Sequence, residues 1–180
     1  MLERDMRASF EANLPHRLRR ASRVQLQHFI PAHWFAAAAS ECAGMYIAGF
    51  FYGAISVAQA YVEALSRFLA EHHRVRTLND VRERCRRLHR QGFLSEQALD
   101  AAVAILEGRN DFHHLNKQVP EGYQDLETRA EQCVNHLHIV ESEVFAYSFG
   151  DEPGKLTLRM PEYWPSGGPG SARVGIRQPW

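Results

Sequence analysis

Six consecutive residues, Arg109 to His114, combine the side chains of this sequence that are best suited to acid–base chemistry on a phosphate. They read Arg-Asn-Asp-Phe-His-His and end a strongly helical segment. An arginine can hold a phosphate with a fork of donors, and a histidine can exchange a proton near neutral pH. Together these groups could cleave RNA without a metal ion. The alternative is a polar helix end, where cationic side chains face the negative pole of the helix dipole.

Helix geometry bears on which histidine would work with the arginine. On a straight helix Arg109 and His113 lie roughly 40° apart around the axis, whereas Arg109 and His114 lie roughly 140° apart. Spacing alone therefore favours His113 as the partner of Arg109.

The elements that must position this motif are helical. Apolar residues recur at spacings of three, four and seven along most of the chain, as one face of a buried helix requires. The pattern allows a bend near Gly44 or Gly49, and Pro15 is expected to break the first helix. We predict an all-α, up-and-down bundle of about five helices, over parts of 1–28 and over 33–72, 79–91, 95–107 and 126–145.

The end of the chain has a different character. Residues 151–180 are rich in proline and glycine. Apolar and polar residues alternate over 155–160, which predicts a strand, and 173–177 predicts a second short strand. We therefore expect a helical domain over 1–150 and a short β or irregular extension over 151–180, with a possible short hairpin.

The charge is balanced overall but uneven along the chain. The 180 residues carry a formal net charge of zero, so the whole-chain charge requires neither nucleic acid nor a membrane. Segment 72–90 is rich in arginine, and segment 121–152 is rich in acids. The basic segment could form a substrate-binding face. The candidate substrate-binding residues are Arg86, Arg87, Arg90 and, beyond the motif, Lys117.

Cysteine usage and hydropathy predict a cytoplasmic protein that does not enter a membrane. The three cysteines are far apart, which argues against a disulfide framework and for a reducing compartment. Residues 1–23 contain no apolar signal core. Residues 42–62 carry no formal charge and are long enough to span a bilayer. Their glycines and modest hydropathy favour a central helix buried within the bundle instead.

Three features in order resemble the HEPN superfamily of small helical domains. A long helix over 53–65 comes first, followed by a Leu-x-x-x-Gly helix end at 88–93 (Leu-His-Arg-Gln-Gly-Phe). A helix with the Arg-Asn-x-x-x-His signature, Arg109 to His114, comes last. The resemblance covers about a third of the chain.

The resemblance implies a metal-independent endoribonuclease that works as a homodimer, with the motifs of two protomers facing one cleft. By position in the motif, Arg109 would hold the scissile phosphate and Asn110 would orient the phosphate or the histidine. His114 would be the general acid or base, with His113 as the second choice. No cofactor is implied.

The resemblance also implies possible settings and partners. Members occur in toxin–antitoxin, phage-defence and RNA-processing systems, so RNA and an antitoxin or regulatory protein are the expected partners. Many toxin members carry a tyrosine two residues after the motif histidine, where this sequence has Asn116. Other members have lost activity and serve as binding or assembly modules. A non-catalytic helical module that binds a partner protein or nucleotide is therefore the alternative function.

A metal site is the other alternative, because the chain has ten histidines. The clusters at 72–73, 113–114 and 136–138 lack the i, i+4 spacing that places two ligands on one helix face. His138 and Glu141 form only a weak pair, and we expect no metal ligands.

Glu63 follows the uncharged stretch. It could orient Arg109 or a histidine, or mark the exposed end of a turn, and the sequence leaves both interpretations open.

Overall fold

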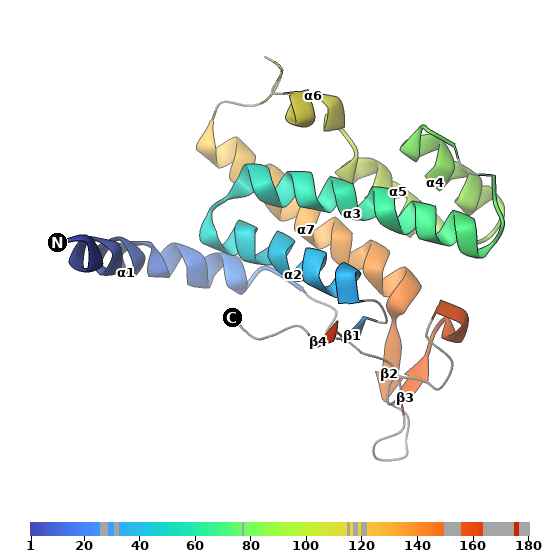
Figure 1. The fold of residues 1–180 in the computed structure, drawn as a ribbon, viewed down its shortest axis with the longest axis horizontal. Coiled ribbons are helices and arrows are strands. Elements are labelled where there is room, and N and C mark those ends of the chain that lie inside the picture. Colours follow the sequence, from blue (N-terminus) through green and yellow to red (C-terminus); the bar gives the residue numbers. More distant parts are fainter. Residues whose placement is uncertain are drawn as a thin grey trace.

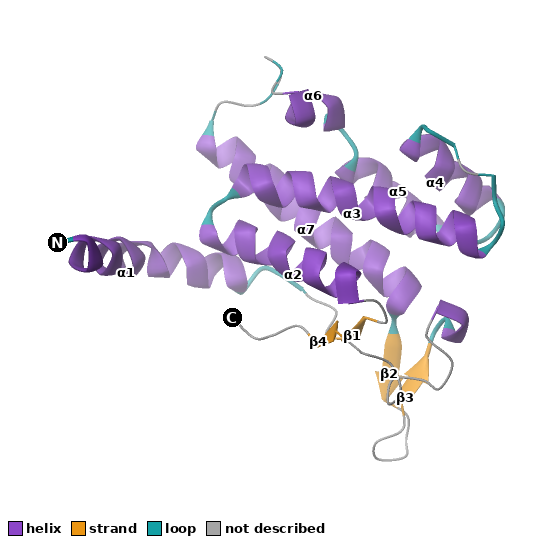
Figure 2. Ribbon diagram, in the orientation of Figure 1, coloured by secondary structure: helices purple, strands orange, loops and turns teal. Residues whose placement is uncertain are grey.

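The apolar repeat of residues 51–72 forms helix α3 (Phe51–His72), the central element of the computed structural model (Figure 1). The structure describes residues 1–25, 29–30, 33–76, 78–114, 116, 119, 122–149, 156–163 and 175–176. Helix α3 packs against α2 (His33–Ala48), α4 (Val81–Arg90) and α7 (Tyr123–Phe145), and α5 (Glu96–Ile105) packs against α7. The core lies between these helices, and its largest fully buried side chains include Tyr46, Tyr61 and Phe145. The predicted all-α bundle is confirmed (Figure 2).

The described residues contain seven α-helices rather than about five, and one reason is a break in the segment 33–72. Helix α2 ends at Ala48 and α3 begins at Phe51. Gly49 has a φ of +92°, and the amides of Gly49 and Phe50 bond back to the carbonyls of Tyr46 and Met45. This is the hydrogen-bond pattern of a glycine-terminated helix. A side chain is strained at this φ, so the turn favours glycine; a Cβ would also lie 2.7 Å from the Tyr123 hydroxyl, which would have to move.

The same break divides the uncharged run at 42–62 between two helices. Within the described ranges, none of the helices has the length and hydrophobicity that crossing a bilayer requires.

The prediction that Pro15 breaks the first helix was wrong. Helix α1 (Leu2–Ala21) continues through this proline. Only the C-terminal end of α1 meets the bundle, and the rest projects away from it (Figure 1).

Among the described residues, four short strands form two antiparallel pairs. Strand β2 (Tyr147–Phe149) pairs with β3 (Leu156–Leu158), with Tyr147 opposite Leu158. Strand β1 (Phe29–Ile30) pairs with β4 (Gly175–Ile176). Both strands predicted near the end of the chain therefore exist, but they do not pair with each other. The β2–β3 hairpin crosses the expected domain boundary at residue 150.

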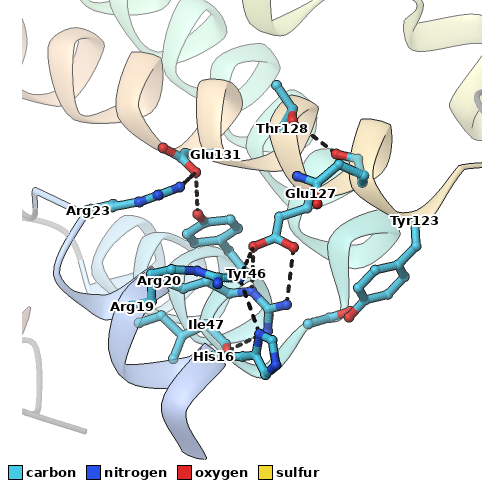
Figure 3. A network of polar contacts seen from close by, with 12 residues as sticks. His16, Arg19, Arg20, Arg23, Tyr46, Ile47, Tyr123, Glu127, Thr128 and Glu131 are labelled. Carbon is cyan, nitrogen blue, oxygen red and sulfur yellow. Dashed lines mark hydrogen bonds and ion pairs between the residues drawn. The ribbon is translucent and has the colours of Figure 1, made fainter. Parts of the chain in front are cut away.

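A buried ion pair fixes the end of α1 to α7 (Figure 3). Arg20 donates through Nε to Glu127 at 3.0 Å and through Nη2 at 3.3 Å, and both residues are 5 % exposed. The guanidinium lies over the Phe51 ring, 4.8 Å from its centroid. The hydrogen bond from Arg20 holds the pKa of Glu127 below its usual value. The base of α1 is thus anchored by a buried charge pair.

A second contact of the same network joins the helices beside this pair. The hydroxyl of Tyr46 donates to Glu131 at 2.7 Å, and Arg23 reaches the same carboxylate oxygen at 3.1 Å (Figure 3). Burial, and then the bond to Glu131, raise the pKa of Tyr46.

The short 3₁₀ helix η1 (Pro161–Tyr163) is fixed to the end of α3 by an aromatic cluster. His73 stacks on Phe93 with ring centroids 3.7 Å apart, and its Nε2 lies 2.6 Å from the hydroxyl of Tyr163. Burial, and then the neighbouring His72, lower the pKa of His73 below 6.5, although Glu162 opposes the shift.

Replacing Arg20 by methionine should destabilise the fold by about 3 kcal/mol, because it leaves the Glu127 carboxylate buried without its main partner. The matched control is Arg19→Met. Arg19 is 49 % exposed and lies 3.7 Å from the same carboxylate, so its loss should cost less than about 1 kcal/mol. Urea unfolding followed by circular dichroism measures both. Equal losses in the two variants would contradict this account.

Stability should fall as the pH is lowered from 7.5 to 5.5. Burial lowers the pKa of both His73 and His136 below 6.5. Below pH 6.5 these two histidines therefore bind protons more readily in the unfolded chain than in the folded one. The free energy of unfolding falls as a result. Carboxylates with a usual pKa near 4.5 titrate mainly below this window. The urea midpoint measured at both pH values checks this.

In the variant His73→Phe the midpoint should depend less on pH over the same range. An unchanged slope in His73→Phe would show that this ring does not contribute.

Candidate functional site

The turn after α5 is held by side chains from three other helices. A helix end leaves carbonyls without partners, and these carry partial negative charge. Arg129 of α7 donates to the carbonyls of Ala104 (2.7 Å) and Glu107 (3.0 Å). Arg82 of α4 donates to Leu106 at 2.8 Å, and the buried Gln59 of α3 donates to Ile105 at 3.1 Å. These bonds fix where the chain leaves α5.

The motif lies on a helix of its own. Gly108, with a φ of +64°, turns the chain, and the separate helix α6 (Arg109–His114) follows. The expectation that the motif ends the preceding helix was therefore wrong. Phe112 is buried and meets the ring of Tyr52 of α3 edge-on, with centroids 5.4 Å apart. This contact anchors α6 on the bundle.

Arg109 is paired with Glu63. Its Nη2 donates to Oε2 of Glu63 at 2.5 Å, and 36 % of the Arg109 side chain remains exposed. Its Nε is buried and has no hydrogen-bond partner among the described residues. Of the two interpretations left open for Glu63, orientation of Arg109 is the one observed.

Two further arginines lie near Glu63, and one of them contacts its carboxylate. Arg67, one turn after Glu63 on α3, donates to Oε1 of Glu63 at 2.9 Å. Arg84 is 3 % exposed and donates to Ser66 Oγ at 3.0 Å and to the Leu78 carbonyl at 2.8 Å. Burial, and then the charge of Arg67, lower the pKa of Arg84. The Glu63 carboxylate thus pairs with Arg67 and Arg109, and the buried Arg84 adds a third positive charge nearby.

A cavity of about 550 Å³ opens beside this cluster, between the start of α4 and the α5–α6 turn. Its polar lining includes Arg82, Arg109 and Asn110. Two acids also line it, and each already accepts hydrogen bonds. Asp80 caps α4 by accepting from the amides of residues 82 and 83, and Asp111 accepts from the side chain of Asn116 at 3.0 Å. The cavity is therefore lined by two arginines and two acids, beside the amide of Asn110.

The two histidines of the motif lie outside this lining. His113 and His114 are exposed near the end of α6. Because residues 109–114 form a regular helical turn and a half, His113 lies nearer to Arg109 around the axis, as the spacing indicates. The structure thus brings Arg109 and Asn110 together at the cavity and leaves both imidazoles accessible to solvent.

The predicted substrate-binding residues lie along α4, away from the cavity. Arg86 and Arg90 are exposed and pair with Glu83 at 3.8 and 2.6 Å, while Arg87 is half-buried. The hydrogen bond from Arg90 lowers the pKa of Glu83. Lys117 lies outside the described residues.

Sequence reasoning missed the arginines nearest to the motif. Arg82 precedes Arg86 by one turn, and the capping signal of Asp80 would have placed it at the start of the helix, beside the turn. Arg67 follows Glu63 by four residues, the spacing of an ion pair on one helix face. No sequence signal identifies Arg84. Its partners are neutral acceptors, and the sequence does not distinguish a buried arginine of this kind from an exposed one.

In the part of the chain that the structure describes, no three His, Cys, Asp or Glu side chains gather as metal ligands would. Glu141, considered above with His138, is buried and accepts a hydrogen bond from the Tyr61 hydroxyl at 2.8 Å. The cysteines Cys42, Cys85 and Cys133 are all buried and unbridged.

Searches of protein-family models, curated proteins and solved structures found no match to this chain.

Replacing Arg129 by methionine should destabilise the protein by about 2 kcal/mol, because two carbonyls at the end of α5 lose a charged donor. The control Arg86→Met changes an exposed arginine on α4 and should stay within about 0.5 kcal/mol of the parent. Urea unfolding measures both. An Arg129 variant as stable as the control would mean that the turn is held by other contacts.

Proposed function

We propose that this protein is a metal-independent endoribonuclease of the HEPN type, acting as a cytoplasmic homodimer. The observation that carries the proposal is the state of Arg109. Its guanidinium is oriented by Glu63, and the Arg109 side chain is partly exposed at a polar cavity. The exposed part of this side chain could bind a phosphate oxygen there.

The proposed reaction uses the nucleophile that RNA carries. A base removes the proton of the 2′-hydroxyl, whose oxygen attacks the adjacent phosphorus. An acid protonates the 5′ oxygen as its bond to phosphorus breaks. The products are a 2′,3′-cyclic phosphate and a 5′-hydroxyl. Arg109 would stabilise the charge on the phosphorane, and His114 of each protomer would serve as base or acid, with His113 as the second candidate.

The arginines of α4 suit a bound nucleic-acid strand. Arg82 lines the cavity, and Arg86 and Arg90 follow at intervals of four residues, so they form a row that leads away from it. The rise between neighbours is about 6 Å. Such a row would contact the backbone electrostatically and without regard to sequence.

A second function is supported by one specific observation. His113 and His114 do not line the cavity that Arg109 and Asn110 line. A module that binds a nucleotide or RNA phosphate at Arg109 without cleaving it would need only the cavity. Binding and cleavage must therefore be measured separately.

The purified chain should cleave single-stranded RNA in the presence of EDTA and leave cyclic phosphate ends. Arg109→Ala and His114→Ala should each lower the rate by about 100-fold or more, because each removes a group that acts in the transition state. Gel analysis of end-labelled RNA gives both the rate and the chemistry of the ends.

Two controls sharpen the result. His113→Ala changes the neighbouring imidazole and tests which histidine acts. Arg86→Gln should weaken RNA binding, measured by fluorescence anisotropy, and leave the rate at saturating RNA unchanged. Normal cleavage by the Arg109 variant would refute the nuclease proposal. RNA binding that requires Arg109 without any cleavage would favour the second function.

A further inference from the structure

The cavity beside Arg109 has a lining of mixed charge, which a simple anion does not match. Its volume of about 550 Å³ lies in the range of pockets that hold small organic ligands, about 300 to 1,000 Å³. Arg82 and Arg109 line it together with the carboxylates of Asp80 and Asp111. Inorganic phosphate would be attracted by the first pair and repelled by the second. The lining therefore suits a ligand that carries hydrogen-bond donors as well as an anionic group.

A metal cation fits the same carboxylates less well. The two arginines in the lining would repel a cation. Among the residues that the structure describes, no third His, Cys, Asp or Glu joins the two acids as a ligand. The acids are therefore better matched by neutral N–H groups of a ligand.

Asp111 is the better placed of the two carboxylates. Its Oδ1 accepts from the Asn116 side chain at 3.0 Å, which holds the group in position. Its Oδ2 accepts no hydrogen bond from the described residues, and it lies 3.9 Å from the point that a Cβ of Gly108 would occupy. Gly108 also lines the cavity. Asp80, by contrast, is exposed and caps α4, where its Oδ1 accepts from two main-chain amides.

We propose that the cavity binds a guanine nucleotide of the RNA, with a phosphate at Arg109 and the base at Asp111. Guanine presents two adjacent donors, N1–H and N2–H, on one edge, and a carboxylate can accept from both. Its other edge presents the acceptors O6 and N7, for which Arg82 and Asn110 offer donors in the same lining. This inference rests on the proposed function, because it takes RNA as the ligand.

The other three bases match a carboxylate less well. Adenine and cytosine each place a ring acceptor beside their amino group, and uracil places its single N3–H between two carbonyl oxygens. A carboxylate only accepts hydrogen bonds, so with each of these bases it would face another acceptor. Guanine alone avoids this conflict.

The rest of the lining suits the ring of a base. Val81 and Leu106 are buried side chains that give the cavity an apolar part. Arg82 is held by its hydrogen bond to the Leu106 carbonyl at 2.8 Å, and a guanidinium plane can stack on a base or donate to it. Arg86 and Arg90 do not line the cavity and remain contacts for the RNA backbone. Sequence would therefore be read at the cavity and not along α4.

Nucleotide binding to the full chain, measured by isothermal titration calorimetry, tests the base. The parent protein should bind GMP at least about tenfold more tightly than AMP, CMP or UMP, because one bidentate contact discriminates by this much. Comparison of 3′-GMP with 5′-GMP shows on which side of the guanosine the bound phosphate lies. Equal affinities for the four bases in both series would overturn the proposal.

The sign of one charge change tests the role of Asp111. Asp111→Asn should weaken GMP about tenfold, because the amide offers a donor where guanine needs an acceptor. If the cavity held only the phosphate, the same change would remove a repulsive charge, and GMP would bind more tightly. Tighter or unchanged GMP binding by a variant that circular dichroism shows to be folded would overturn the proposal.

Two matched controls remove the same charge elsewhere. Asp80→Asn keeps a good cap on α4, since asparagine caps helices as well as aspartate does. It should bind GMP at least as tightly as the parent, because a charge that repels the phosphate is lost. Asp100→Asn changes an exposed acid of α5 outside the cavity and should alter the affinity by less than about twofold. A loss in either control as large as in Asp111→Asn would contradict a specific contact.

Cleavage of an RNA oligonucleotide that contains all four bases separates this inference from the proposed function. Cuts confined to positions beside guanosine, with that preference lost in Asp111→Asn, would support both. Cleavage without regard to the base would overturn the guanine site and leave the nuclease in place. Binding of GMP that requires Asp111, without cleavage of any RNA, would support the guanine site and refute the nuclease.

Discussion

The end of helix α5 is the constraint on which the rest of the site depends. Four successive carbonyls there, from Ala104 to Glu107, accept hydrogen bonds from Gln59, Arg82 and Arg129. These donors come from α3, α4 and α7, so the turn is tied to most of the bundle at once. The carbonyl groups at the end of a helix need hydrogen-bond donors from elsewhere. Because these donors hold the last turn of α5 in place, they fix the direction in which the chain leaves it, and this direction determines the position of Arg109.

Glu63 gives the central helix a second role beside its packing. Helix α3 buries its apolar face among α2, α4 and α7, and Glu63 lies at the edge of that face, where it meets Arg67 and Arg109. An arginine held this way loses little further freedom when it binds an anion, since its planar group is already oriented. The carboxylate would compete with a phosphate bound at Arg109, so under the proposed function occupancy of the site would be a balance between the two anions.

The sequence predicted the features that depend on residues close together in the chain, namely helices and their ends. The apolar repeats located the helices, and Gly92 ends α4 as expected. The break at Gly49 was only one of two candidate bends, because Gly44 has the same residue type and the positive φ of Gly49 cannot be read from the sequence. The pair of Glu63 with Arg109 joins residues 46 positions apart, and no spacing rule reaches that far. The partners of the strands were missed for the same reason.

The pairing of β1 with β4 has a consequence for how the chain acquires its structure during synthesis. Ile30 lies opposite Gly175, about 145 residues later. At a translation rate of 5 to 20 residues per second, roughly 7 to 30 s pass before the second strand is made. The helices in between have local contacts and fold much faster than that. Strand β1 is therefore made well before its partner, and the β1–β4 pair can form only after α7, the last helix of the bundle, has been synthesised.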